Sequence, residues 1–418
     1  MRYDELFKVR FDELGKIITG KTPSTKVNQY WDGKIQFITP KDIQINKYVN
    51  ETDRYITEEG LNSINNILLG EGAVAVSCIG NIGYVGKIIH KAVTNQQLNT
   101  IIPNQYYDSD YVYYLMKNSW SLFKSLENQS TTVSIINKSQ FSSLEVSVFK
   151  EKKKQKAIAN ILSSLDDKIE LNNKINKNLE EIAQTLYKRW FVDFEFPNEN
   201  GEPYKSSGGE MVDSELGLIP KGWKIEFLGS SRLTKLMKSG ILRFDGSKKY
   251  IATADVSDTS ITSFSTKITF DERPSRANMQ PKINSVWFAK MKDSRKLIRV
   301  SENSSYLLSK CIFSTGFAGI ETINSLNYIW TYLISTDFDE TKNNLCNGTT
   351  MQAINNDNIK RIRILSPNIH VLKMYEDLVQ PLFDLVESNS IQNDKLAKTR
   401  DELLPKLMSG EIEVPIEE

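Results

Sequence analysis

The chain has 418 residues, of which 39% are hydrophobic and 25% charged, a composition typical of a globular protein with two or three cores. No stretch approaches the roughly 18 apolar residues of a membrane span, and the opening MRYDELFKVRFDEL lacks the apolar core of a secretory signal. The net charge is +1, and Cys78, Cys311 and Cys346 are too scattered for a disulfide framework or a zinc cluster, so we expect a cytoplasmic protein.

Residues 1–150 are predicted to form a first mixed domain, rich in strands. Short β-prone runs such as GKIQFITPKDI, GAVAVSCIG and NTIIP are separated by Gly, Pro and Asn. Several loop residues between these runs could contact nucleic acid, because Asn and Gln read adenine edges and Lys and Thr hold phosphates. Each is also a common loop residue. The candidates are Lys21, Thr22, Lys41, Asn81, Asn95 and Gln96.

Residues 151–196 are predicted to form a long helix. Apolar residues recur there in 4-3-4-3 steps, which is the seam of a coiled coil and requires a second helix along its length. Two asparagines occupy heptad positions in the middle of the seam. The seam residues are Ile158, Leu162, Leu165, Ile169, Asn172, Asn176, Leu179, Leu186 and Trp190.

Residues 197–220 are rich in Gly, Pro, Ser and acids and are predicted to be a linker, and residues 221–366 a second mixed domain. From Ser230 to Val300 this domain has fifteen Lys and Arg against six acids, the charge pattern expected for binding a polyanion. A solvated surface is the alternative. The candidate contacts in this stretch are Arg273, Arg276, Lys290, Lys292, Arg295 and Lys296.

Residues 367–410 repeat the long helix, and residues 411–418 form an acidic tail. The second helix carries its two asparagines at the same heptad positions as the first. Its seam residues are Val379, Leu382, Val386, Asn389, Asn393, Leu396, Leu403 and Leu407. The segments FITPKDI and YIATADV extend the match into the mixed domains. A repeat of about 215 residues is too long for a solenoid unit and indicates a tandem duplication of a whole domain with its helix.

Sequence motifs of catalysis are absent from the chain. His90 and His370 are the two histidines, they lie far apart, and no phosphate-binding loop, HExxH motif or nucleophile elbow occurs. The sequence therefore favours a binding protein over an enzyme.

The chain resembles the specificity (S) subunits of type I restriction-modification enzymes over nearly its whole length. The matching phrases are QKAIANILSSLDDKIELNNKIN, EEIAQTLYKRWFVDF, SGGEMVDSELGLIPKGW, LLPKLMSGEIEV, FITPKDI, TNQQLNTIIP and SRANMQPKINSVWFAKMKDS. The helix and linker phrases are specific, and the others are weaker.

The resemblance implies an α+β fold in which two similar target recognition domains are separated by two long antiparallel helices with pseudo-twofold symmetry. Each domain would read one half of a bipartite, asymmetric site on double-stranded DNA. The helices would act as a spacer and dock two methylation (M) subunits, and restriction (R) subunits would join them. This subunit would be non-catalytic and hold no cofactor or metal, whereas its partners would bring S-adenosylmethionine, ATP and Mg.

Antiparallel packing makes a specific prediction for the asparagines. If the two helices are related by a twofold axis through the middle of the seam, Asn172 faces Asn393 and Asn176 faces Asn389. A buried amide facing leucine loses its hydrogen bonds, so these pairs would penalise a slipped register. The rod, roughly 50 Å long at 1.5 Å per residue, would then set a fixed distance between two DNA readers.

Two other functions fit parts of this pattern. One is a coiled-coil scaffold with two modules that bind protein or sugar, against which the basic stretch argues. The other is a fused restriction-methylation enzyme, against which the lack of catalytic motifs argues.

Overall fold

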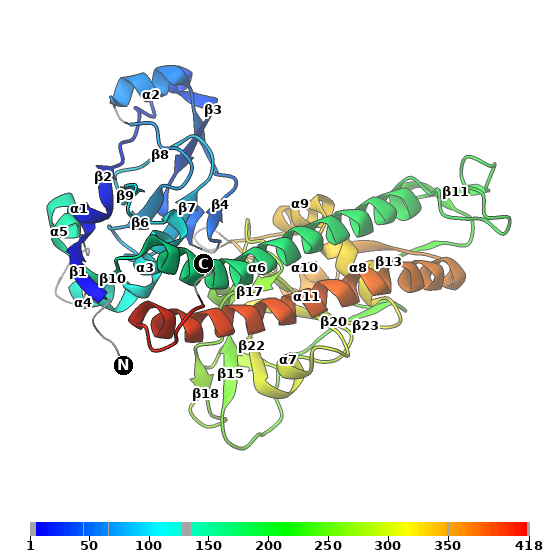
Figure 1. The fold of residues 1–418 in the computed structure, drawn as a ribbon. Coiled ribbons are helices and arrows are strands. Elements are labelled where there is room, and N and C mark those ends of the chain that lie inside the picture. Colours follow the sequence, from blue (N-terminus) through cyan, green and yellow to red (C-terminus); the bar gives the residue numbers. More distant parts are fainter. Residues whose placement is uncertain (1–5, 45, 66, 128–134, 349–351, 416–418) are drawn as a thin grey trace. The chain divides into compact units, whose positions relative to one another are not determined.

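The computed structural model describes residues 6–44, 46–65, 67–127, 135–348 and 352–415 (Figure 1). Their packing divides the chain into two compact units. The first unit comprises residues 1–173 and 391–418, and the second comprises residues 174–390. Two long helices, α6 (Lys152–Tyr187) and α11 (Ile369–Ser409), each contribute one part to either unit. Among the described residues, no helix is long and apolar enough to cross a membrane.

The first unit contains a five-stranded sheet of order β2-β9-β6-β7-β4, a three-stranded sheet of order β5-β3-β8, and the separate pair β1-β10. Its strands are β1 (Leu6–Arg10), β2 (Gly15–Thr19), β3 (Trp31–Ile38), β4 (Tyr48–Val49), β5 (Tyr55–Ile56), β6 (Val74–Ser77), β7 (Val85–Ile88), β8 (Ala92–Thr94), β9 (Leu98–Pro103) and β10 (Glu145–Phe149). Its helices before α6 are α1 (Phe11–Leu14), α2 (Glu58–Ile64), α3 (Ser109–Asn118), α4 (Trp120–Glu127) and α5 (Lys138–Ser143).

The core of the first unit forms where its central strand and helix are apolar on every side. Strand β6 reads Val-Ala-Val-Ser and is buried throughout, as expected of an inner strand. Helix α3 buries six consecutive residues, Tyr111–Met116, because the sheet covers one side and α6 the other. The hydroxyl of Tyr114 donates to Asp166 of α6 at 2.6 Å, so even the polar end of this buried ring is paired.

The second unit contains two four-stranded sheets, of order β14-β23-β20-β21 and β18-β15-β22-β19, and the pairs β11-β12, β13-β24 and β16-β17. Its strands are β11 (Met211–Ser214), β12 (Gly217–Pro220), β13 (Lys224–Phe227), β14 (Thr234–Leu236), β15 (Lys248–Ile251), β16 (Val256–Ser257), β17 (Ser260–Ile261), β18 (Lys267–Ile268), β19 (Ala277–Met279), β20 (Ser285–Ala289), β21 (Leu297–Val300), β22 (Cys311–Ser314), β23 (Phe317–Thr322) and β24 (Arg363–Ser366). Its helices before α11 are α7 (Ser305–Lys310), α8 (Leu326–Leu333), α9 (Thr336–Asn344) and α10 (Asn356–Ile359).

The two units repeat one topology. Strands β2 and β6 both pair antiparallel with β9, as β14 and β20 do with β23. Strand β3 is parallel to β8 and antiparallel to β5, and β15 has the same relation to β22 and β18. In each unit a pair of strands, β1-β10 or β13-β24, brackets the mixed region before its long helix begins. The tandem duplication predicted from the sequence is therefore a duplication of fold.

The stretch 197–220, which we expected to be a linker, is folded onto the second unit. Strands β11 and β12 form a hairpin within it. The ring of Phe196 stacks between Tyr204 and Trp223, with ring centroids 4.6 and 4.9 Å apart. These aromatic residues pack the stretch against the core of the second unit. The Gly, Pro and Ser content of the stretch did not indicate this contact. Of the expected acidic tail, residues 416–418 lie outside the described residues.

The long helices pack antiparallel within each unit, as the sequence predicts. In the first unit, the Asn172 amide donates to Asn393 Oδ1 at 2.8 Å, and in the second, the Asn389 amide donates to Asn176 Oδ1 at 2.8 Å. These are the predicted pairs. Asn172 and Asn389 are buried, so the four asparagines form polar contacts inside an otherwise apolar seam.

The remaining seam residues are buried or half-buried. Those that are buried are Ile158, Leu162, Trp190, Val379 and Leu407, and those that are half-buried are Leu165, Ile169, Leu179, Leu186, Leu382, Val386, Leu396 and Leu403. A second buried face, containing Phe383 and Leu404, was not predicted. It exists because the mixed regions also pack on the helices, which a heptad pattern alone does not reveal.

Candidate nucleic-acid interface

Three loops of the first unit meet at the ends of strands β2, β6 and β8. The backbone N–H of Lys21, which follows β2, donates to the carbonyl of Thr94 at the end of β8, at 2.9 Å. The N–H of Cys78, which follows β6, donates to the carbonyl of Gln97 in the β8-β9 loop at 2.8 Å. Segments far apart in sequence therefore form one continuous loop surface.

This loop surface brings most of the predicted polar residues of the first unit together. The hydroxyl of Thr22 donates to Gln96 Oε1, and both side chains are exposed. Asn81 is exposed on the loop that follows β6. A Cβ at Gly20 would lie 2.1 Å from the carbonyl oxygen of Asn95, so glycine is what allows these loops to approach.

Other predicted residues of the first unit are occupied by contacts within the protein. Asn95 is buried and exchanges hydrogen bonds of 2.9 and 3.1 Å with Gln97, so it shapes the β8-β9 loop rather than its surface. The ammonium of Lys21 donates to two carbonyls at the end of α2. Lys41 follows β3 and forms an exposed ion pair with Asp53.

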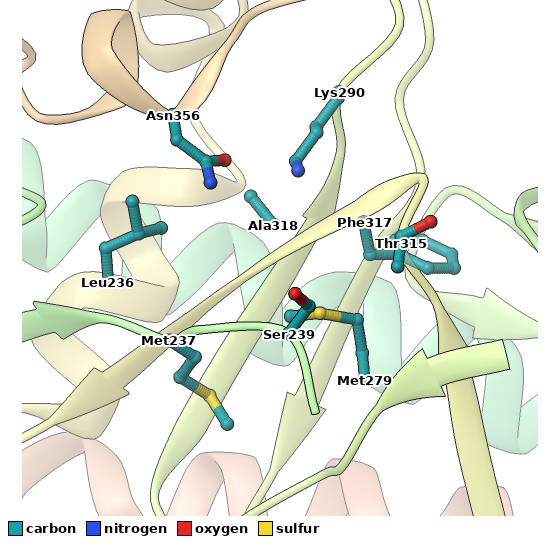
Figure 2. Close-up of a pocket in the computed structure, with 9 residues that line it drawn as sticks. All are labelled: Leu236, Met237, Ser239, Met279, Lys290, Thr315, Phe317, Ala318 and Asn356. Atoms are coloured by element: carbon teal, nitrogen blue, oxygen red, sulfur yellow. The ribbon is translucent and has the colours of Figure 1, made fainter. Parts of the chain in front are cut away.

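The corresponding loops of the second unit line a cavity of about 110 Å³, which Figure 2 shows with its lining side chains. The lining residues are Leu236, Met237, Ser239, Met279, Lys290, Thr315, Phe317, Ala318 and Asn356. They come from the ends of β14, β19 and β20, the turn between β22 and β23, the start of β23, and the start of α10. Of the predicted cations, Lys290 is the one in this pocket, and its neighbours include one amide and two hydroxyls.

A second cationic site, here called the Phe244–Phe270 cluster, consists of Phe244, Phe270, Arg243, Lys248 and Arg273. The two rings are edge to face with centroids 5.8 Å apart. The guanidinium groups of Arg243 and Arg273 lie 5.5 and 4.2 Å from the Phe270 centroid, and the Lys248 ammonium lies 5.1 Å from that of Phe244. Cation–π contacts hold the three cations at the rings. Arg243 also pairs with Asp271 at 3.7 Å, and Arg273 donates to the carbonyl of Phe270, so part of the hydrogen-bonding capacity of the two arginines is already used.

Like charges oppose each other on the strands beside this cluster. Lys249 of β15 lies directly opposite Lys267 of β18, which is the edge strand of its sheet. Directly opposed like charges destabilise a sheet. A polyanion lying along this edge would remove that repulsion, so the strand pair and the Phe244–Phe270 cluster together form a basic face suited to nucleic acid.

Two predicted cations of the second unit have structural roles instead. Arg295 is held between the carboxylates of Asp258 and Asp339, at 2.7 Å from each. Lys296 donates to the carbonyl of Thr253 at 2.6 Å. Part of the basic excess between residues 230 and 300 is therefore neutralised inside the fold, which sequence counting cannot detect.

The remaining predicted cations of the second unit differ in their surroundings. Arg273 belongs to the Phe244–Phe270 cluster, Lys290 lines the pocket, and Arg276 and Lys292 are exposed. Sequence reasoning missed Arg243, Lys248 and the two phenylalanines. No local pattern connects them, because Phe244 and Phe270 meet through strand pairing.

In each unit, the mixed region is fixed to its own long helix by carboxylates at equivalent positions of that helix. In the first unit, Tyr48 donates to Asp167 at 2.7 Å and Asn50 donates to Glu170 at 2.8 Å. In the second, the heptad counterparts of these acids, Asp384 and Glu387, accept hydrogen bonds from Asn303 and from two serines. The duplicated anchors hold each loop surface in a fixed orientation to its helix.

A buried charge cluster strengthens the anchor of the first unit. Asp110 pairs with Lys47 and Lys87 at 2.7 Å each, and Lys47 also donates to Ser163 of α6 at 2.7 Å. Burial lowers the pKa of Lys47, in spite of Asp110. The two lysines lower the pKa of Asp110, although burial opposes them, so this carboxylate stays charged.

Comparison with known proteins points to one family. The family described as "Type I restriction modification DNA specificity domain" matches residues 4–181. The specificity subunit of the type I restriction enzyme MjaIX from Methanocaldococcus jannaschii is 29% identical, over 97% of this chain and 93% of that protein. Residues 4–181 therefore match this domain family, and the chain as a whole is similar to type I specificity subunits. Specificity subunits are non-catalytic DNA-recognition proteins, which agrees with the absence of catalytic motifs from the sequence.

Two further matches agree with this similarity. The specificity subunit of the type I restriction enzyme HindI from Haemophilus influenzae is 26% identical, over 68% of this chain and 73% of that protein. The crystal structure of a type I restriction-modification S subunit from M. genitalium superposes with a TM-score of 0.51, at 16% identity, and covers 96% of both chains. The chain therefore shares the fold of that S subunit over nearly its whole length.

Proposed function

We propose that this chain directs a type I restriction-modification enzyme to a bipartite, asymmetric DNA sequence. The observation that carries the proposal is the repeat of one fold with different chemistry at the equivalent loops. The first unit presents Thr22, Asn81 and Gln96, whereas the second presents the exposed Lys292, two residues after the pocket residue Lys290. Two readers with different side chains would recognise two different half-sites.

The basic face of the second unit supports DNA as the ligand. Three cations surround the rings of the Phe244–Phe270 cluster, and Lys249 and Lys267 add two more beside it. Phosphate contacts by Lys and Arg supply most of the sequence-independent affinity of a DNA-binding protein. The overall charge of +1 means that this face is a local feature rather than a result of composition.

The paired helices would serve as the spacer between the two readers. The pairs Asn172–Asn393 and Asn176–Asn389 fix one register of α6 on α11, because any slip would place a buried amide against leucine. A fixed register would give a fixed distance between the half-sites.

An exposed apolar stripe on α11 supports docking of a partner helix, for which we propose an M subunit. Met374, Leu378 and Leu385 are 40%, 46% and 45% exposed, and their steps of four and seven residues place them on one face. The seam face of the same helix is already filled by Tyr375 and Val379. We further propose that R subunits join this complex and that S-adenosylmethionine, ATP and Mg are bound by the partners. The three free cysteines fit a reducing cytoplasm.

The proposed function is tested by expressing the chain with and without its M subunits in a host that lacks other adenine methylation, followed by methylome sequencing. We expect one split motif to become methylated when M is present. The purified chain alone should transfer no methyl group and cut no DNA, since it lacks residues for either reaction. Methylation by the chain alone, or methylation of an undivided motif, would contradict the proposal.

The docking proposal predicts that Leu378→Asp with Leu385→Asp abolishes co-purification with the M subunits. Two carboxylates in an apolar interface would be desolvated without partners. Both leucines are nearly half-exposed in this chain, so we expect its own thermal unfolding to change little. The matched control is Leu242→Asp, because Leu242 is 80% exposed but lies outside the helices. Equal loss of M binding in both variants would argue against the stripe.

A further inference from the structure

The pocket of the second unit contains a lysine with no counter-charge. Lys290 follows strand β20, where its backbone N–H donates to Gly316 and its carbonyl accepts from Ile354, both at 2.9 Å. Figure 2 shows its side chain and that of Asn356 pointing into the same space. Among the described residues, its ammonium has no hydrogen bond or ion pair.

Half-burial of this ammonium is unfavourable by itself. Burial lowers the pKa of Lys290, and no carboxylate acts in the opposite direction. The floor of the pocket is apolar, formed by Met237, Met279 and Phe317, all of which are buried. A cation above an apolar floor is poorly hydrated, so an anion that enters the pocket would interact with it more strongly than at an open surface.

We propose that this pocket binds one backbone phosphate of the DNA at the half-site read by the second unit. The inference rests on the proposed function. The polar side chains of the pocket are Lys290, Ser239, Thr315 and Asn356. Lysine, serine, threonine and asparagine are the side-chain types that contact DNA phosphates, and such contacts fix the position of a protein on the duplex.

A phosphate suits the pocket better than a base edge does. The bases of a duplex lie inside the grooves, so side chains that read them must project from the protein, whereas Lys290 is recessed. Phosphates project from the duplex and can enter a pocket. The residue equivalent to Lys290 in the first unit is Cys78, since each accepts a hydrogen bond from an isoleucine, Ile354 or Ile136. Cys78 is buried, so the phosphate site belongs to the second unit alone.

The test is Lys290→Met in the chain assembled with its M subunits. We expect DNA affinity at low salt to fall about tenfold, the loss of one charge-assisted contact. The slope of log affinity against log salt should become shallower by about 0.9. The methylated motif should stay unchanged. Lys310→Met is the matched control: Lys310 is an exposed lysine at the end of α7, and its loss should leave both affinity and slope nearly unaltered.

A neutral methylphosphonate placed at each DNA position in turn identifies the contacted phosphate. At one position of the half-site read by the second unit, the substitution should weaken binding by the wild-type chain and have no effect on Lys290→Met. If the loss of affinity from the methylphosphonate and that from Lys290→Met were additive at every position, the inference would be overturned. A relaxed motif in Lys290→Met would overturn it too, because it would indicate a base contact. Inorganic phosphate could instead raise the thermal stability of the wild-type chain but not of Lys290→Met, while the variant binds DNA normally. That result would indicate a site for a free anion and would also overturn the inference. If wild-type complexes bind no specific site, the proposed function fails instead.

Discussion

Exchanging residues 221–366 for the same region of a relative with a different target should change one half of the recognised sequence and leave the other half unaltered. The reason is that the second unit has sheets and an apolar core of its own. The measurement is methylome sequencing of a host that carries the hybrid chain and its M subunits.

The distance between the half-sites should also be unaltered in this hybrid. The exchanged segment ends before Ile369, where α11 begins, so both asparagine pairs remain. A control hybrid that exchanges residues 1–150 should change the other half-site only. If both half-sites or their separation changed in either hybrid, the two-reader proposal would be wrong.

The long helices were predictable because their pattern is local and repeated. Heptad spacing identifies both seams, and the duplication predicts the pairs Asn172–Asn393 and Asn176–Asn389 that the structure contains. A period of 3.5 residues depends only on neighbours along the chain. The second buried face, which includes Phe383, depends on contacts with the mixed regions and could not be found in this way.

The candidate interface was less predictable, because it depends on which strands pair. The cluster of Phe244 and Phe270 forms through the pairing of β15 with β18. Composition marked residues 230–300 as basic, but it could not distinguish Arg295, enclosed by two carboxylates, from Arg273, which lies over the half-buried ring of Phe270. Ion pairs between distant segments are properties of the fold, so charge density indicated a basic region but not which of its cations are neutralised by carboxylates.

Replacing Asp166 by Asn should destabilise the first unit by about 3 kcal/mol, the lower end of the cost of breaking a buried ion pair. Asp166 of α6 pairs with Arg400 of α11, and their side chains are 5% and 13% exposed. Asp166 also accepts from the hydroxyl of Tyr114, so one carboxylate joins both long helices to α3. The lower end of the range is expected because Arg400 keeps a second partner, Asp401, at 2.7 Å. The measurement is urea unfolding followed by circular dichroism.

Two further variants separate the ion pair from the hydrogen bond. Tyr114→Phe removes one hydrogen bond to a charged group and should cost about 1.5 kcal/mol. The double variant Asp166→Leu with Arg400→Met should recover most of the stability lost in Asp166→Asn, because an apolar pair of similar size leaves no buried charge without a partner. If instead the double variant were less stable than Asp166→Asn, the ion pair would contribute net stability rather than specificity. In that case the attraction between the two charges would exceed the cost of removing both from water.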